Sequence, residues 1–234
     1  MRTKKVILFI VEGISDKISL GGIIDRIIKD NDDEVRFLVT NGDITSDSST
    51  TRQNAINKVG NHINRFRKEN FLKKSDIIKV VHMVDTDGTY IARKYIVKKD
   101  AGHLRYTTEH IYGKNVQFVY ERNQKKRDIM NRLSRCVQIS GIKYSIYYFS
   151  CNLEHVLHDE LDMHDKYKLD KAEEFAESFY GKEYEFIDFI SDPEFAVPGD
   201  YRQTWEFIKW GRHSLNRYCN FHLFFEKYKD AANR

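Results

Sequence analysis

Apolar residues divide the first part of the chain into strands that alternate with helices. A continuous apolar run at 6–11 has the length and composition of a strand that is buried on both faces, and the mostly apolar runs at 35–39 and 77–84 predict a second and a third strand. Between these runs, apolar residues recur at steps of three and four over 18–28 and 55–66, which is the period of a helix that buries one face. This alternation predicts an α/β fold with a mostly parallel sheet, flanked by helices and joined by right-handed crossovers.

The pattern is less regular after residue 88. Residues 88–114 are basic and aromatic, and we expect an insertion or a mobile loop there. Short apolar runs predict a fourth strand at 116–120 and a fifth strand at 144–149. The segment 125–137 between them has the period of an amphipathic helix, so the alternation of strands and helices continues to about residue 150.

Helical patterns rich in Phe, Tyr and Trp replace the strands from about residue 159 onward. Pro193 and Pro198 lie in a connector between these patterns, where they interrupt helices. The sequence therefore predicts an α/β domain at 1–158 and a helical C-terminal region at 159–234. The helices expected in that region span 172–180, 201–210 and 215–228.

Carboxylates follow two of the buried strands. Glu12 and Asp16 come after the first strand, and Asp85 and Asp87 end the third. Because buried strands cannot easily carry charge, acids at their carboxyl ends suggest a site at the edge of a parallel sheet. Carboxylate oxygens are hard ligands that suit Mg²⁺ or Mn²⁺, and these metals hold phosphate oxygens and activate water. Strand-end acids that cap helices or face solvent remain an alternative.

These two motifs together resemble the Toprim domain, which topoisomerases, bacterial primases, small RNA-maturation nucleases and the nuclease halves of OLD-family proteins share. The first strand ends in Val-Glu-Gly with Asp16 soon after, and the third ends in Val-Asp-x-Asp-Gly; the resemblance covers roughly residues 4–160. It implies that Glu12 is a metal ligand or general acid/base and that Asp85 and Asp87 hold the metal. Asp16 would join a second metal site, although a first-turn helix acid is an equally good interpretation of it.

Glu154 is a further candidate metal ligand. It follows the fifth predicted strand in the stretch Ser-Cys-Asn-Leu-Glu, which resembles a Ser-x-Pro-x-x-Glu segment of small Toprim nucleases in defence systems. The sequence departs from that pattern at Asn152 and Leu153, and Glu154 could instead begin a helix. Lys143 is a possible match for the basic residue of the family.

Net charge says little about a polyanionic partner, since 39 basic and 35 acidic residues give only +4. The basic residues that cluster after the second acidic motif are a better indication. They could form a groove for a phosphate backbone, with tyrosines that stack on bases, or a plain solvated face. The candidate nucleic-acid-binding residues are Arg93, Lys94, Lys98, Lys99, Lys125, Lys126 and Arg127.

Charged residues near the N-terminus, the cysteines and one histidine narrow the classes of protein further. Glu12, Asp16 and Lys17 interrupt the apolar N-terminal run too early for a signal peptide or a membrane span, so we expect no membrane partner. Three cysteines without a Cys-x-x-Cys pair fit a reducing cytoplasm. His82 alternates with apolar residues in the third strand, which predicts a hydrogen-bonded core histidine.

The resemblance implies a compact endonuclease that depends on Mg²⁺ or Mn²⁺ and cleaves DNA or RNA. The chain is too short for the gate of a topoisomerase or for the zinc- and helicase-binding parts of a primase. By analogy with small Toprim proteins, the role would be defence against phage, with an ATPase partner protein or as a homodimer. Two alternatives stay open: a non-catalytic Toprim module that binds, regulates or partners an ATPase, and a maturase of structured RNA.

Overall fold

The computed structural model describes residues 5–29, 33–100 and 102–232. The chain forms two compact units that interleave along the sequence. Neither unit coincides with residues 1–158 or 159–234, and that division into domains stays a prediction. Unit 1 comprises the residues up to 84, 129–147 and 169–186, and unit 2 comprises 85–128, 148–168 and 187 onward.

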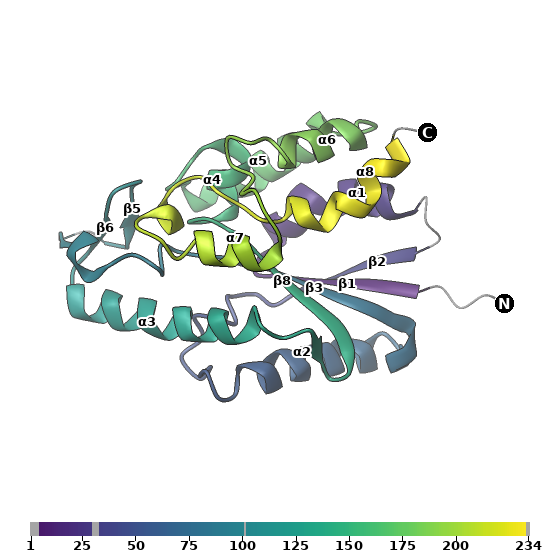
Figure 1. Cartoon of the computed structure of the whole chain (residues 1–234), viewed down its shortest axis with the longest axis horizontal. Coiled ribbons are helices and arrows are strands. Elements are labelled where there is room, and N and C mark those ends of the chain that lie inside the picture. The colour runs from purple at the N-terminus through teal and green to yellow at the C-terminus, as the bar shows by residue number, and fades with distance from the viewer. Residues whose placement is uncertain (1–4, 30–32, 101, 233–234) are drawn as a thin grey trace. The chain divides into compact units, whose positions relative to one another are not determined.

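A five-stranded sheet is the centre of unit 1, with strand order β2-β1-β3-β8-β7 (Figure 1). β2 and β3 both pair with β1 in parallel, whereas β7 pairs with β8 in the antiparallel sense. The strands are β1 (Lys5–Val11), β2 (Asp33–Val39), β3 (Ile77–Asp85), β7 (Gln138–Ile139) and β8 (Ile142–Phe149), and the last residues of β3 and β8 belong to unit 2. The predicted α/β fold with a mostly parallel sheet is confirmed at this level.

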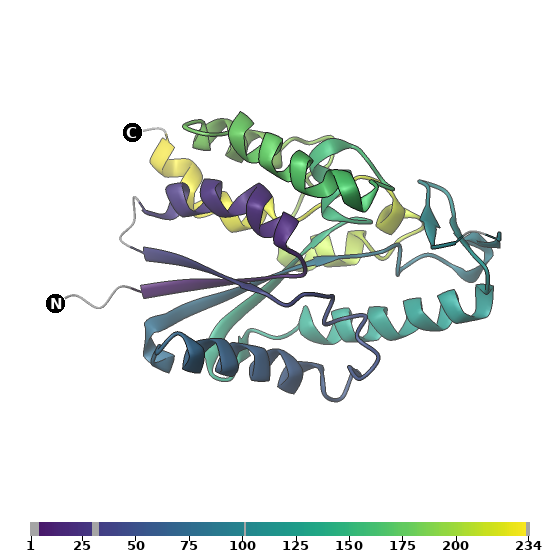
Figure 2. The same cartoon turned by 180° about the vertical axis from the view of Figure 1, so that it is seen from behind.

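Helices cover both faces of this sheet. α1 (Ile14–Lys29) and α2 (Ala55–Glu69) lie on opposite faces, as Figures 1 and 2 show. α1 buries Leu20 and four isoleucines, and α2 buries Val59, Ile63 and Phe66, so each helix turns its predicted apolar stripe inward. His82 of β3 is buried with its Nδ1 2.8 Å from the Tyr144 hydroxyl, which confirms the predicted core histidine.

The structure contradicts one expectation for the middle of the chain and shows regular elements in the segment expected to be an insertion or a mobile loop. Residues 116–120 begin the helix α3 (Val116–Leu133) and form no strand, because the buried positions Val119, Asn123, Lys126 and Met130 recur at helical steps. The expected loop at 88–114 contains a small sheet with strand order β4-β6-β5. Its elements are η2 (Arg93–Tyr95), β4 (Ile96–Lys98), β5 (Arg105–Tyr106) and β6 (Ile111–Gly113).

The later helices differ in length from the predicted ones: α5 begins earlier than 172 and is longer, whereas α7 and α8 are shorter than 201–210 and 215–228. A capping box at Asp200 and Gln203 starts α7, and Ile208 ends it three residues earlier than the apolar pattern does. The remaining helical elements are η1 (Lys74–Asp76), α4 (Leu153–His158), α5 (Asp165–Ser178), α6 (Glu183–Ile190), α7 (Tyr201–Phe207), η3 (His213–Leu215) and α8 (His222–Ala232). Among the residues that the structure describes, none of the helices combines the length and apolar composition that a membrane crossing requires.

His155 in α4 makes the stability of unit 2 depend on pH. The side chain is buried, and burial lowers its pKa to about 4, with the Asp159 carboxylate opposing this shift. The unfolded chain therefore takes up a proton below its ordinary pKa, near 6.5, before the folded chain does, so stability falls as pH falls toward 4. Between about pH 7.5 and about pH 5 we expect the wild type to lose about 2 kcal/mol more unfolding free energy than His155→Gln. Urea denaturation of both proteins at each pH measures this difference, and equal losses would contradict it.

Candidate functional site

The second acidic motif forms a hydrogen-bonded turn at the end of β3. Asp87 and Gly88 have φ angles of 48° and 63°, and a Cβ on Gly88 would lie 2.5 Å from Leu215, so only glycine fits. The buried Thr86 between the acids donates its N–H to Phe149 O at 3.0 Å and its hydroxyl to Ser214 O at 3.0 Å. The turn therefore holds the partly exposed Asp85 and Asp87 on a fixed backbone.

Cations from α3 bind Asp87. Lys126 Nζ lies 2.5 Å from Asp87 Oδ2, and the lysine side chain is 0% exposed, against 27% for the aspartate. Arg122, one turn earlier, donates to the Asp87 carbonyl at 3.1 Å and to the Tyr106 hydroxyl at 2.9 Å. Burial lowers the pKa of Arg122, but Tyr106 and Asp87 raise it more. Lys126, a candidate nucleic-acid-binding residue from the sequence, is buried because helical spacing turns it inward, and its part in binding nucleic acid stays a prediction.

Glu154 has a lysine partner as well. Asn152 caps α4 by accepting the His155 N–H at 2.8 Å, which places Glu154 in the first turn, where it is largely buried. Lys168 of α5 lies 3.5 Å from Glu154 Oε1. Burial lowers the pKa of Lys168, but Glu154, Asp165 and Asp85 together raise it above its usual value.

Asp85 affects the pKa of groups near both Glu154 and Asp87. Asp85 acts on the pKa of Lys168, and burial, Asp87 and Asp85 raise the pKa of the Cys151 thiol well above its usual value. Unit 2 therefore contains three of the five predicted metal ligands, Asp85, Asp87 and Glu154, two of which have a lysine partner. We call this group the acid–lysine cluster; it comprises Asp85, Asp87, Glu154, Lys126 and Lys168.

The acid–lysine cluster fits Mg²⁺ or Mn²⁺ in the chemistry of its ligands but not in their arrangement. Its carboxylates offer only hard oxygen atoms, which both ions prefer. Lysine ammonium groups already neutralise Asp87 and Glu154. Over residues 5–29, 33–100 and 102–232, no three or more His, Cys, Asp or Glu side chains are arranged to hold a metal ion. A divalent cation would have to take a carboxylate from a lysine.

Glu12 and Asp16 belong to unit 1, where Asp16 has a structural role. Its Oδ2 accepts hydrogen bonds from the N–H groups of Glu12 and Gly13 at 3.1 and 3.0 Å. The carboxylate in the first turn of α1 therefore binds the backbone that leads into the helix. This geometry favours the first-turn helix interpretation of Asp16 over a metal ligand. Lys143 is exposed at the start of β8, where it lines a pocket with Ile77 at the start of β3. It therefore lies at the amino ends of the strands, whereas the acids follow the carboxyl ends.

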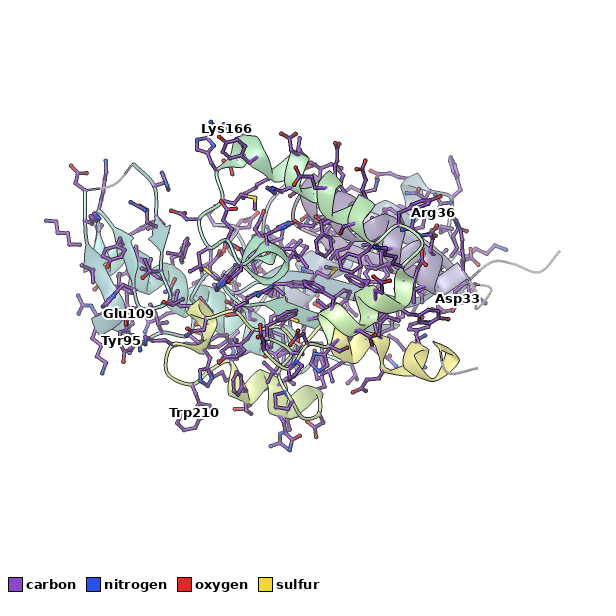
Figure 3. The ribbon with its side chains drawn as sticks, turned by 90° about the horizontal axis from the view of Figure 1, so that it is seen from above. Asp33, Arg36, Tyr95, Glu109, Lys166 and Trp210 are labelled. Atoms are coloured by element: carbon purple, nitrogen blue, oxygen red, sulfur yellow. The ribbon has the colours of Figure 1, made fainter. Side chains whose placement is uncertain are left out.

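In unit 2, cationic side chains lie over aromatic rings of η2 and β6. Lys94 and Arg212 lie 5.0 and 5.4 Å from the Tyr95 ring centre, and Lys99 lies 5.2 Å from that of Tyr112. The His110 ring stands between the two tyrosine rings, 6.2 and 5.9 Å from their centres. Figure 3 labels Tyr95 and Trp210, and Trp210 is 71% exposed. The basic-aromatic surface comprises Arg93, Lys94, Tyr95, Lys98, Lys99, His110, Tyr112 and Arg212.

Lys125 and Arg127 are more exposed than Lys126. Both side chains are half-exposed on α3, so they can meet solvent or a ligand as the sequence suggested. Their role in binding nucleic acid stays a prediction, as does that of Arg93 and Lys94 in η2, Lys98 at the end of β4 and Lys99 after it, all of which are exposed.

The sequence did not point to Arg122 or Lys168. Arg122 shares a helix face with Lys126, and this signal would have been visible if 116–133 had been interpreted as one helix. Lys168 meets Glu154 only through the folded chain, and no local pattern marks it. No protein-family model, no curated protein and no solved structure matches the chain. The likeness to Toprim proteins thus stays a prediction from the residues of the acidic motifs.

Proposed function

We propose that the chain is a nuclease that hydrolyses phosphodiester bonds of DNA or RNA with the aid of Mg²⁺ or Mn²⁺. The observation that supports this most is the hydrogen-bonded turn that holds Asp85 and Asp87 partly exposed at the end of a parallel strand, with Lys168 within electrostatic reach of both Asp85 and Glu154. Sites of α/β proteins commonly lie at the carboxyl ends of such strands. When bound, the metal would hold phosphate oxygens and activate water.

Different residues of unit 2 would bind the cation and the phosphate of the substrate. Asp85, Asp87 and Glu154 would hold the cation, and Lys168, whose side chain is 35% exposed, would bind a phosphate oxygen once it leaves Glu154. The sequence resemblance assigns Glu12 of unit 1 to the same reaction, as a metal ligand or general acid/base. The basic-aromatic surface would bind the strand, since its cations attract phosphates and its rings can stack on bases.

The biological setting rests on the resemblance alone. Small Toprim proteins of phage-defence systems suggest a role in defence, together with an ATPase partner protein or as a homodimer. Exposed apolar side chains in unit 2, such as Phe118 and Trp210, are suitable material for a protein interface.

A second candidate function is a nucleic-acid-binding module without catalysis. The lysine partners of Asp87 and Glu154 favour it, because an ammonium group on each carboxylate supplies the charge that a metal would otherwise bring. In that case the acids stabilise the fold, and only the basic-aromatic surface has a partner.

A panel of substrates tests the proposed function. Plasmid DNA, single-stranded DNA, tRNA and precursor rRNA are each incubated with the protein and Mg²⁺, Mn²⁺ or EDTA. We expect cleavage of at least one substrate with metal and none with EDTA, because the carboxylates alone cannot supply the positive charge that phosphoryl transfer needs. Binding without cleavage in every metal would favour the module, and cleavage that is unchanged in EDTA would contradict the metal requirement.

A further inference from the structure

One edge of the main sheet in unit 1 has no neighbouring strand. β2 is the last strand on its side of the sheet, and among the residues that the structure describes it pairs with β1 alone (Figure 1). All seven residues of β2 are half-exposed or exposed. An open edge strand of this length is a template for a further strand. We call the side of Asp33–Val39 that faces away from β1 the β2 edge.

The odd-numbered residues of β2 turn their backbone groups toward this open side. Thr40 N–H donates to Val11 O at 3.0 Å, so the backbone of Thr40 faces β1. Backbone groups of successive residues in a strand point to opposite edges, so the even-numbered residues of β2 also face β1. Val35 and Phe37 therefore direct their N–H and C=O groups at the β2 edge. An added strand could bond to them without disturbing the pairing of β2 with β1.

The side chains of β2 form an apolar face and a charged face. The Phe37 and Phe9 rings are stacked with their centres 5.1 Å apart, and Phe37 lies against Gly21 of α1, so the odd-numbered side chains face α1. Glu34 and Arg36 lie on the other face, where they form an ion pair with each other. The arginine side chain is 52% exposed and the glutamate side chain 27% exposed, so both can contact a strand at the β2 edge.

The order of these charges makes the strand complementary to itself in one register. A two-fold axis places β2 antiparallel to β2 of a second copy. With Val35 on the axis, Glu34 of each copy lies opposite Arg36 of the other, at positions without backbone bonds, where side chains are closest. An axis at Glu34 or at Arg36 would place like charges opposite each other. An axis at Phe37 or at Leu38 would place each charge opposite an uncharged residue.

We propose that the β2 edge binds the β2 edge of a second copy of this chain, in the antiparallel sense and with the two-fold axis at Val35. The two sheets would join through backbone hydrogen bonds and through four charges of alternating sign. The charges favour a second copy as the partner, because the strand carries both members of each ion pair across the axis. This surface would form the homodimer that the proposed function includes, but the dimer itself requires no nuclease activity.

Sedimentation velocity of the full chain at increasing protein concentration measures the dissociation constant of the dimer. We expect this constant to rise about tenfold in Arg36→Glu and in Glu34→Arg, because each variant creates two pairs of like charges across the axis. The double variant Glu34→Arg/Arg36→Glu exchanges the two signs and should restore the wild-type constant. Lys68→Glu makes the same change of charge at an exposed residue of α2 and is the matched control, with an unchanged constant.

Val35→Pro tests the backbone part of the interface. The Val35 N–H faces the β2 edge, so proline removes a donor from the dimer and none from the pairing with β1. We expect this variant to be monomeric, with the circular dichroism spectrum of the wild type.

A monomeric wild type at every concentration would overturn the proposal, and so would a dimer that Arg36→Glu and Glu34→Arg leave as tight as the wild type. A double variant as weak as the single variants would overturn the register at Val35. These outcomes are independent of the nuclease. A dimer that cleaves no substrate of the panel keeps the interface and removes the nuclease, whereas a monomer that cleaves does the reverse.

Discussion

Asp85→Asn is expected to lower the rate of phosphodiester cleavage on the order of 10³-fold while the chain stays folded. The variant keeps the shape of the side chain and removes its charge, which the proposed reaction needs for the cation. The turn itself should persist, because the bonds of Thr86 and the glycine fit at Gly88 hold it independently of the Asp85 carboxylate. Initial rates on the best substrate of the panel, with circular dichroism as a check of folding, measure the effect.

Two further variants make this result specific. Glu12→Gln should show a loss of similar size if Glu12 acts in the same reaction, as the sequence predicts. Asp165→Asn removes a highly exposed carboxylate that lies 3.3 Å from Lys168, so it changes local charge without touching the turn, and it should keep nearly the wild-type rate. Wild-type cleavage by Asp85→Asn would remove this residue from the reaction and leave the non-catalytic module as the better interpretation.

Lys126→Met is expected to lower the unfolding free energy by about 2 to 4 kcal/mol, because it leaves the Asp87 carboxylate without its buried ammonium partner. Asp87→Asn should lower the unfolding free energy by a similar amount, because it leaves the fully buried Lys126 ammonium group without its carboxylate partner. The double variant should be less destabilised than the sum of the two by about 1 to 3 kcal/mol, because both single changes break the same ion pair. Denaturant unfolding of the four proteins gives all three quantities.

Mn²⁺ affinity tests whether the Lys126–Asp87 ion pair competes with a metal ion or has only a structural role. If a cation must displace Lys126 from Asp87, then Lys126→Met should bind Mn²⁺ more tightly than the wild type, a change that electron paramagnetic resonance detects. Lys125→Met removes a neighbouring, half-exposed lysine from the same helix and should alter both stability and Mn²⁺ affinity much less. Equal stability of Lys126→Met, Asp87→Asn and the wild type would show that the ion pair contributes nothing.

The strands were predictable from their short, mostly apolar runs. Residues 6–11, 77–84 and 144–149 lie in strands that are largely buried, because both faces of a covered sheet need apolar side chains. Residues 35–39 also lie in a strand, although β2 is only partly buried and Arg36 is exposed. The run at 116–120 was misleading, since five residues cannot distinguish a strand from one face of a helix. The helix becomes visible only when buried polar residues such as Asn123 and Lys126 are counted with the apolar ones.

The acids of the site were predictable, but their partners were not. Asp85 and Asp87 stand out because charge ends an apolar strand, and the positive φ at Asp87 and Gly88 follows from the turn that such an end requires. The lysines that neutralise these carboxylates come from α3 and α5. Their pairing depends on how remote segments pack, and this information is not in any local pattern of the sequence.

The interleaving of the two units limits how the protein can be dissected. The chain passes from one unit to the other within β3, α3, β8, α5 and α6, so each passage lies inside a regular element and not in a linker. A fragment that ends at residue 158 would take the stretch 169–186 from unit 1 and Lys168 from unit 2 at once. A loss of activity in such a fragment would therefore report incomplete folding of both units and would not assign any task to the C-terminal helices.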